Sequence, residues 1–295
     1  MTLNKVLRLT VLSACLMSPI AYAQDNQLDI HSLSDTVHVI SGDGGNVTVI
    51  KDDRGLLVID AGLRSKQEEL MMTLAEMSDL PISKLVNTHW HYDHVGGNSG
   101  MADQGATVMA HSNVRDRMMK GGTIAAFGAE IPPASDDELP VITYQDAIQL
   151  HWGGLALDVQ HFPGGHTDGD SIVFVDGNDI VVMGDIYFHS NYPFIDASSG
   201  GSIGGVIVAL DKVLSRIDDS TVVIPGHGGA TATKQDLMDY RHMLASVQRD
   251  LSAIKKTGKS LQEVLDAKPT AAFDAVYNDG FLKADTWVKL IYESL

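Results

Sequence analysis

The chain has 295 residues, 44% of them hydrophobic, which is enough to build a sizeable buried core. Its 38 acidic residues outnumber its 21 lysines and arginines, and the net charge is −17. Nucleic-acid binding depends on clustered Lys and Arg, so this balance argues against a nucleic-acid partner.

The first part of the chain is typical of a secretory signal peptide. Residues 1–23 contain two basic residues, no acidic residue and an apolar stretch from Leu9 to Ile20, and they end in Ala-Tyr-Ala. We expect cleavage after Ala23 and a periplasmic or secreted protein without disulfides, because Cys15 is the only cysteine. No apolar stretch of the sequence is long enough for a transmembrane helix. A Leu-Ser-Ala-Cys run leaves open a lipid-anchored form attached through Cys15.

Beyond residues 24–32, which we expect to be an N-terminal extension, strand-like and helix-like segments alternate. Apolar runs at 37–40 and 47–50 flank a glycine-rich segment and predict a β-hairpin. Residues 120–140 show no clear periodicity, which predicts either a functional flap or a simple surface loop. The other elements predicted in the first half are strands at 56–60, 81–87 and 107–110 and helices at 65–77 and 112–120.

The second half begins with strands and ends with helices. No linker separates the strand-rich halves, 33–150 and 151–230, so we predict one domain over 33–243 with 244–295 as a helical segment packed on it. The predicted elements are strands within 141–159 and at 171–175 and 180–184, helices at 204–216, 234–256 and 284–294, and a short helix opened by the capping-box pattern Ser260-Leu261-Gln262-Glu263.

The segment from Thr88 to Asn98 is the most informative part of the chain. It holds an HxHxDH pattern formed by His89, His91, Asp93 and His94, directly after an apolar strand-like run. Alternate residues of an extended segment share a face, so His89, His91 and Asp93 point the same way, whereas Asp93 and His94 diverge. Imidazole and carboxylate are preferred zinc ligands, and the pattern can supply two neighbouring metals.

Three further candidate ligands lie farther along the chain. His166, Asp185 and His227 each follow an apolar strand-like run and each lie next to a glycine. A single residue of this kind is weak evidence, but the recurrence of strand, glycine and ligand supports all three together. The HxHxDH segment alone leaves both metals short of ligands, and these residues would complete them.

Asp60 lies at the end of the run Leu57-Val58-Ile59 and completes a set of five motifs. In chain order these are Asp60, the HxHxDH segment, His166, Asp185 and His227. In this order the motifs resemble the metallo-β-lactamase superfamily, and the resemblance extends from about residue 33 to about residue 243. It implies an α/β fold, the αββα sandwich, with the site at one edge between the two sheets. The motif order is specific for the superfamily and not for a substrate.

The resemblance also implies a role for each residue of these motifs. Asp60 would be no ligand but would orient the ligand loop through hydrogen bonds. Two Zn²⁺ ions are expected, although other divalent metals, including iron, use overlapping ligand sets. The implied ligands are His89, His91 and His166 for a first zinc, Asp93, His94 and His227 for a second, and Asp185 as a bridge between the two.

The expected chemistry is hydrolysis. A water shared by two zinc ions has its pKa lowered from about 15.7 to roughly 7, which supplies hydroxide at neutral pH. We expect attack on a carbonyl of a small molecule, in an ester, thioester, lactone or cyclic amide, with Asp93 accepting the proton of the water. The serine-rich run at 197–202 lacks the G-x-S-x-G elbow of serine hydrolases.

Three functions stay open within this resemblance. β-Lactamases of the thiolate-bearing subclass have a cysteine at the position of Asp185 and, three residues later, a lysine that pairs with the carboxylate of the antibiotic; here that later residue is Phe188. The aspartate is more similar to that of glyoxalase II and lactonases, although basic residues for glutathione are not evident. An exported zinc hydrolase is the leading hypothesis; a genuine β-lactamase and a metal-retaining binding protein without turnover are the alternatives.

The loop that follows Asp185 is rich in aromatic residues and could form a wall of the substrate pocket. Tyr187, His189 and Tyr192 are candidate substrate contacts, because each can donate a hydrogen bond to a carbonyl oxygen. We expect Phe188 and Phe194 to pack the loop onto the sheet.

Overall fold

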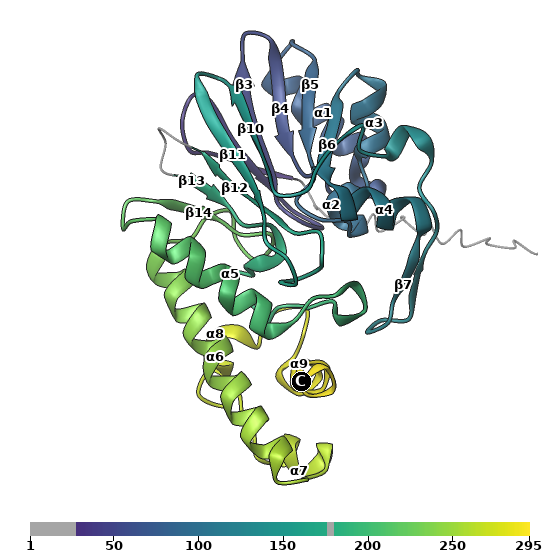
Figure 1. The fold of residues 1–295 in the computed structure, drawn as a ribbon. Coiled ribbons are helices and arrows are strands. Elements are labelled where there is room, and N and C mark those ends of the chain that lie inside the picture. The colour runs from purple at the N-terminus through teal and green to yellow at the C-terminus, as the bar shows by residue number, and fades with distance from the viewer. Residues whose placement is uncertain (1–27, 176–179) are drawn as a thin grey trace, which may run out of the picture.

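The computed structural model describes residues 28–175 and 180–295. Two β-sheets face each other and helices cover their outer faces, so the expected α/β class and αββα sandwich are confirmed (Figure 1). The predicted signal peptide at 1–23, with Cys15, lies outside the described residues. Within the described part, no helix has the length and apolar character needed to cross a membrane.

The first sheet has the strand order β1-β2-β3-β4-β5-β6-β9. Neighbouring strands are antiparallel from β1 to β4 and parallel from β4 to β9. The predicted hairpin is β2–β3. The bounds are β1 (Asp29–Ser32), β2 (Val37–Ser41), β3 (Val47–Asp52), β4 (Gly55–Ile59), β5 (Ile82–Val86), β6 (Thr107–His111) and β9 (Ile142–Tyr144).

The second sheet has the order β10-β11-β12-β13-β14, antiparallel except for the last pair. It begins at Ala147, slightly before the predicted division between residues 150 and 151, because β10 and β11 form one hairpin and must share a sheet. The bounds are β10 (Ala147–Trp152), β11 (Leu155–His161), β12 (Ser171–Val175), β13 (Ile180–Val182) and β14 (Val222–Ile224).

The predicted helices begin and end close to the expected positions. The predicted helix at 65–77 starts with a 3₁₀ turn at Arg64–Lys66, and the predicted capping box is present, since the Glu263 carboxylate accepts from Ser260 N at 2.9 Å. The α-helices of the described residues are α1 (Gln67–Met77), α2 (Tyr92–Val95), α3 (Asn98–Asp103), α4 (Ser112–Lys120), α5 (Ile203–Arg216), α6 (Lys234–Lys256), α7 (Leu261–Asp266), α8 (Asp274–Tyr277) and α9 (Ala284–Ser294). Three short helices among these, α2, α3 and α8, were not predicted.

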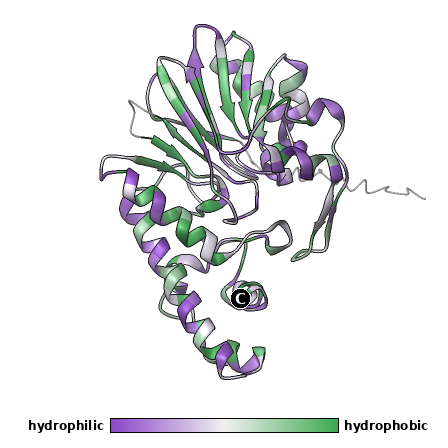
Figure 2. Cartoon of the chain, in the orientation of Figure 1, coloured by the Kyte–Doolittle hydropathy of each residue, from purple (hydrophilic) through white to green (hydrophobic). Residues whose placement is uncertain are grey.

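Alternation along the strands separates the apolar layers. In β4, Leu57 and Ile59 pack in the core between the two sheets, and Leu56 and Val58 pack on the opposite face in a cluster with Leu74 of α1. Successive residues of a strand point to opposite faces, so one strand serves two layers. Figure 2 shows hydrophobic residues along the strands of both sheets. This sandwich holds the strand ends, and the ligand candidates that follow them, at one edge.

Residues 120–140 contain a small hairpin that the sequence pattern did not reveal. Strands β7 (Gly122–Ile124) and β8 (Ala129–Ile131) pair with each other and with no strand of the two sheets. These strands are only three residues long, too short to show a periodic pattern. The hairpin projects away from the sandwich on the side where α9 lies (Figure 1).

The C-terminal helices pack on the second half of the sandwich. Trp287 of α9 is completely buried and belongs to the same apolar cluster as Leu210 of α5 and Tyr240 of α6. Its ring stacks on that of Tyr192, with centroids 4.5 Å apart. Helix α6 crosses the predicted boundary at 243/244 without interruption.

Replacing Trp287 with alanine is expected to lower the free energy of unfolding by about 3–5 kcal/mol, the usual cost of deleting a large buried aromatic ring. Thermal and denaturant unfolding of the purified protein would measure it. Trp287→Phe is the matched control, because it keeps a stacking ring and the indole Nε1 has no hydrogen-bond partner among the described residues. Equal losses in both variants would contradict this account of the packing.

Candidate metal centre

The seven candidate ligands come from four separate segments and meet at one edge of the sandwich. His89 and His91 follow β5, Asp93 and His94 lie on α2, and the other three lie three to five residues beyond the ends of strands of the second sheet. These residues form two groups, and within each group the ligand atoms lie within 4.8 Å of one another. The first group is His89, His91, His166 and Asp185, and the second is Asp93, His94 and His227.

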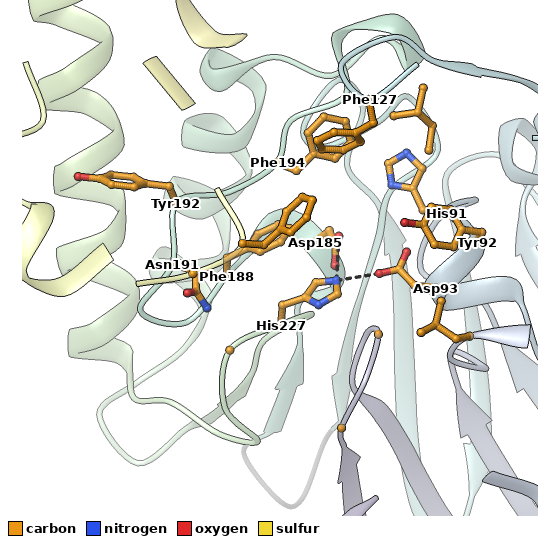
Figure 3. Close-up of a pocket in the computed structure, with 17 residues that line it drawn as sticks. His91, Tyr92, Asp93, Phe127, Asp185, Phe188, Asn191, Tyr192, Phe194 and His227 are labelled. Carbon is orange, nitrogen blue, oxygen red and sulfur yellow. Dashed lines mark ion pairs between the residues drawn. The ribbon is translucent and has the colours of Figure 1, made fainter. Parts of the chain in front are cut away.

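Asp185 lies at the centre of this arrangement. Its two carboxylate oxygens are 3.1 Å from His94 Nε2, 3.4 Å from the Nε2 atoms of both His166 and His227, and 3.7 Å from His89 Nε2. His227 Nε2 is also 3.3 Å from an oxygen of Asp93, and Figure 3 shows both of these ion pairs of His227 across the cavity. The carboxylate of Asp185 therefore faces both groups.

Most of the imidazoles are held by a hydrogen bond on the nitrogen that points away from the centre. His91 Nε2 donates to Asp196 at 3.0 Å, His94 Nδ1 donates to Asp60 at 2.8 Å, and His166 Nδ1 donates to the carbonyl of Phe194 at 2.9 Å. When these imidazoles are neutral, as metal ligands are, each bond fixes the tautomer and leaves the lone pair on the inner nitrogen.

His89 shows the same orientation and provides a test of whether a metal fits. Thr88 Oγ1 donates to Asp60 at 2.7 Å and can accept from His89 Nδ1 at 3.1 Å. His89 Nε2 is then buried without a hydrogen-bond partner among the described residues. A buried lone pair aimed at three other imidazoles and a carboxylate costs free energy unless a cation occupies the space between them. The donor set fits a divalent metal of the zinc type.

The electrostatics of the two ligand groups also favour a bound divalent metal. Burial lowers the pKa of His166 to about 4, which keeps this imidazole neutral, the form that binds metals. Burial also opposes the charge on His227, but Asp185 and Asp93 outweigh it and raise its pKa to about 9. The carboxylates thus attract positive charge into the centre, where a bound cation would supply it.

Asp60 orients the ligand segment rather than facing the centre. Its backbone has φ of 63°, a left-handed conformation that aspartate adopts more readily than most residues. Its carboxylate accepts from Thr88 N at 2.7 Å, from Thr88 Oγ1 and from His94 Nδ1. One buried side chain therefore fixes both the start of the HxHxDH segment and one of its imidazoles.

The structure places the three candidate substrate contacts differently from one another. The backbone of Phe188 pairs with that of His227 as in a β-bridge, and the Phe188 side chain faces the metal centre. Its neighbours Tyr187 and His189 point to the opposite side, because successive residues of an extended segment alternate, and they line a separate cavity. Tyr192 lines the cavity at the metal centre, but it is buried and its hydroxyl donates to Asp274 at 2.8 Å. Phe188 and Phe194 pack in the core, as expected, and also line that cavity.

A cavity of about 410 Å³ opens on the metal centre (Figure 3). Loops of both sheets, the β7–β8 hairpin and the segment between α8 and α9 contribute to it. Its lining residues are Gly42, Gly44, Leu63, His91, Tyr92, Asp93, Ile124, Phe127, Asp185, Phe188, Asn191, Tyr192, Phe194, His227, Gly228, Gly280 and Phe281.

The sequence model of one protein family, described as the metallo-beta-lactamase superfamily, matches residues 40–249. The chain belongs to the metallo-β-lactamase superfamily. The matched region contains Asp60 and all seven candidate ligands. Members of this superfamily are metal-dependent hydrolases, and this protein is one of them.

Curated relatives of this superfamily member include two named hydrolases. The metallo-beta-lactamase type 2 of Bacillus cereus is 24% identical over 188 residues, which is 62% of this chain and 66% of that protein. The hydroxyacylglutathione hydrolase of Haemophilus influenzae is 26% identical over 196 residues, which is 65% of this chain and 89% of that protein.

Solved structures share the fold of this superfamily member. The metallo-beta-lactamase from Pontibacter korlensis has a TM-score of 0.61 at 21% identity, and the match covers 74% of this chain and 99% of that protein. A stereoselective inverting sec-alkylsulfatase from Pseudomonas sp. has a TM-score of 0.66 at 17% identity and covers 90% of this chain. The chain spans half the length of that sulfatase.

Asp196 is a site residue that the sequence analysis missed. Besides His91, its carboxylate accepts from Ser199 Oγ at 2.5 Å, and Trp90 Nε1 donates to that hydroxyl at 3.2 Å. The chain of contacts ties the loop after Asp185 to the HxHxDH segment. No local pattern identifies Asp196, because its imidazole partner is 105 residues away.

Asp196→Asn is expected to weaken zinc binding by about 10- to 100-fold, because it removes the carboxylate that orients the His91 ring. Competition with a chromophoric chelator would measure the affinity. The control is Asp211→Asn, which alters an exposed carboxylate that pairs with Arg241 and does not line the cavity. Unchanged zinc affinity in Asp196→Asn would show that His91 does not depend on this bond.

Proposed function

We propose that this superfamily member is a dinuclear zinc hydrolase that opens a carbonyl bond of a small molecule, in an ester, thioester, lactone or cyclic amide. The observation that carries the proposal is the pair of ligand groups that face one carboxylate, Asp185, and open on a single cavity. Two adjacent metals beside a substrate-sized cavity are suited to activating water and a carbonyl together.

The proposed zinc ligands keep the assignment expected from the sequence. Asp185 is proposed as the bridge because its oxygens lie within 3.4 Å of imidazole nitrogens from both groups. Iron or another divalent metal would use the same donors, so metal analysis of the isolated protein is the deciding measurement. One zinc is assigned to His89, His91 and His166, and the other to Asp93, His94 and His227.

Asp93 is the proposed catalytic base. Two zinc ions at such a centre supply a water with a pKa near 7 and Lewis acidity toward a carbonyl oxygen. Burial opposes ionisation of Asp93, but His94 and His227 outweigh it and lower its pKa to about 2. The carboxylate is therefore ionised at neutral pH, lines the cavity, and can accept the proton that the attacking water gives up.

A β-lactam is the second candidate substrate, supported by the likeness to the Bacillus cereus enzyme. The cavity gives a reason against it. Phe188 stands where a cationic residue would pair with the antibiotic's carboxylate, and its ring stacks on His227 with centroids 5.0 Å apart. The described residues that line the cavity include no Lys or Arg. A thioester is supported by the likeness to hydroxyacylglutathione hydrolase.

We also propose export, supported by the signal-peptide pattern of residues 1–23. Mass spectrometry of the protein recovered from the cell envelope would read the mature N-terminus. A chain beginning at Gln24 supports a periplasmic or secreted form, a lipidated Cys15 supports the anchored alternative, and an intact Met1 contradicts export.

The activity is tested with the zinc-loaded protein, its metal counted, on a chromogenic cephalosporin, a glutathione thioester and a simple lactone, each with and without chelator. Chelator-sensitive turnover of the thioester or lactone at a kcat/KM of about 10⁴ M⁻¹s⁻¹ or more supports the general hydrolase. The same rate on the cephalosporin makes it a β-lactamase. Two bound zinc ions with no turnover on any of the three would favour the binding protein.

A further inference from the structure

The outer wall of the cavity is built from aromatic rings that three distant segments supply. Phe127 lies at the turn between β7 and β8, Phe194 in the loop after Asp185, and Phe281 between α8 and α9. The Phe127 ring is 4.7 Å from that of Phe194 and 5.4 Å from that of Phe281, and all three line the cavity. Figure 3 shows Phe127 and Phe194 together above the metal ligands. We call Phe127 and Phe281 the aromatic clasp.

The C-terminal segment that supplies Phe281 is held firmly against the loop after Asp185. A Cβ at Gly280 would lie 2.0 Å from Asn191 Oδ1, so the two segments are in direct contact. Tyr192 N donates to the carbonyl of Tyr277 at 3.1 Å, and Ala284 N donates to Asn278 Oδ1 at 2.7 Å. Phe281 therefore projects from a fixed support, and its position is set by the fold.

The clasp residues expose apolar surface at the mouth of the cavity, as the neighbouring lining residue Tyr92 also does. Phe281 is 81% exposed and Phe127 is 41% exposed, whereas Phe194 behind them is 9% exposed. Exposed aromatic rings that border a cavity mark a surface that gains free energy when an apolar group covers it. The charged residues of the described lining are Asp93, Asp185 and imidazoles at the metal centre, with no Lys or Arg to attract an anion.

We propose that the aromatic clasp binds an uncharged apolar or aryl group attached to the carbonyl that the centre attacks. The C-terminal segment then determines specificity, and the family model, which ends at residue 249, does not include it. This inference rests on the proposed hydrolase function. The substrate class is an ester, thioester or lactone with an apolar acyl group of several carbons and no negative charge near its end.

The turnover test compares 4-nitrophenyl acetate, 4-nitrophenyl hexanoate and the mono-4-nitrophenyl ester of adipic acid, which places a carboxylate at the end of a six-carbon chain. In each, water adds to the acyl carbon, the bond from the acyl carbon to the 4-nitrophenyl oxygen breaks, and the products are the acyl carboxylate, 4-nitrophenolate and two protons. We expect kcat/KM for hexanoate to exceed the other two by about tenfold or more, since each buried methylene favours binding. A preference for the anionic ester would overturn the proposal.

Variants then assign this preference to the clasp. Phe281→Ala and Phe127→Ala should each reduce the hexanoate-to-acetate ratio of kcat/KM by about tenfold. The control is Val276→Ala, which removes an exposed apolar side chain of α8 that faces a different cavity, and the ratio should not change. An unchanged ratio in both clasp variants would contradict the proposal, while turnover by the wild-type protein would still support the hydrolase.

A binding measurement separates the clasp from catalysis. The uncharged fluorescent probe N-phenyl-1-naphthylamine should bind both metal-free and zinc-loaded protein, and hexanoate anilide should displace it. Phe281→Ala should raise the Kd of the probe about tenfold, whereas Val276→Ala should leave it unchanged. Clasp-dependent binding without ester turnover would overturn the hydrolase proposal alone. Equal probe affinity in wild type and Phe281→Ala would overturn the clasp alone.

Discussion

Gly205→Ala is expected to lower the free energy of unfolding by about 3 kcal/mol or more and to reduce zinc binding at the same time. Gly205 lies in the first turn of α5, and a Cβ there would be 1.7 Å from the carbonyl oxygen of Gly164 and 2.4 Å from its carbon. The contact is with backbone, which cannot rotate away. Because Gly164 is two residues before His166, the shift that relieves the overlap would move this proposed ligand.

The neighbouring glycine provides the matched control. A Cβ at Gly204 would lie 3.3 Å from Gln248 Nε2, the end of a flexible side chain, so Gly204→Ala should be tolerated. Alanine also favours helix over glycine by up to about 1 kcal/mol, which makes a small gain in stability the expected result. Denaturant unfolding with and without zinc would measure both variants. Similar stability of the two would show that α5 does not pack on the ligand loop as described.

Asp93→Asn is expected to reduce kcat by about 10²- to 10⁴-fold, the usual contribution of a positioned proton acceptor. Asparagine keeps the shape of the side chain but cannot take up a proton at neutral pH. The His227 partner at 3.3 Å would then lose its carboxylate. Steady-state kinetics on the best substrate, with zinc content measured on the same samples, would show whether turnover falls with both metals still bound.

The zinc content separates the two roles proposed for Asp93. Loss of turnover at full occupancy supports the base, whereas loss of one zinc supports the ligand role. Asp79→Asn, an exposed aspartate in the turn before β5, serves as the control and should match the wild type. Full turnover by Asp93→Asn would exclude both roles.

The candidate ligands could be predicted because each is determined locally. His166 and His227 lie within five residues of the ends of β11 and β14, and the sandwich then places these strand ends at one edge. The strands could equally be predicted from the sequence, since a short apolar run such as residues 56–59 carries its own signal. The short β7–β8 hairpin carried none, because three residues per strand are too few.

The parts that were not predicted depend on contacts between distant segments. Asp196 orients His91 through a bond between loops, and Phe281 reaches the cavity only because Tyr192 and Trp287 bring the C-terminal segment there. The direction of the Tyr187 side chain depends on the pairing of Phe188 with His227. This pairing joins two loops, so the sequence of one loop does not reveal it.

The stacking of Tyr192 on Trp287 joins the wall of the cavity to a helix near the C-terminal end of the sequence. Local opening of α9 would release the loop after Asp185 together with the helix, so the two should behave as one cooperative unit. Amide protons of α9 should then exchange with solvent at the rate of those at residues 192–196. Occupation of the cavity should slow both to the same degree, which makes hydrogen exchange in this helix a remote reporter of ligand binding.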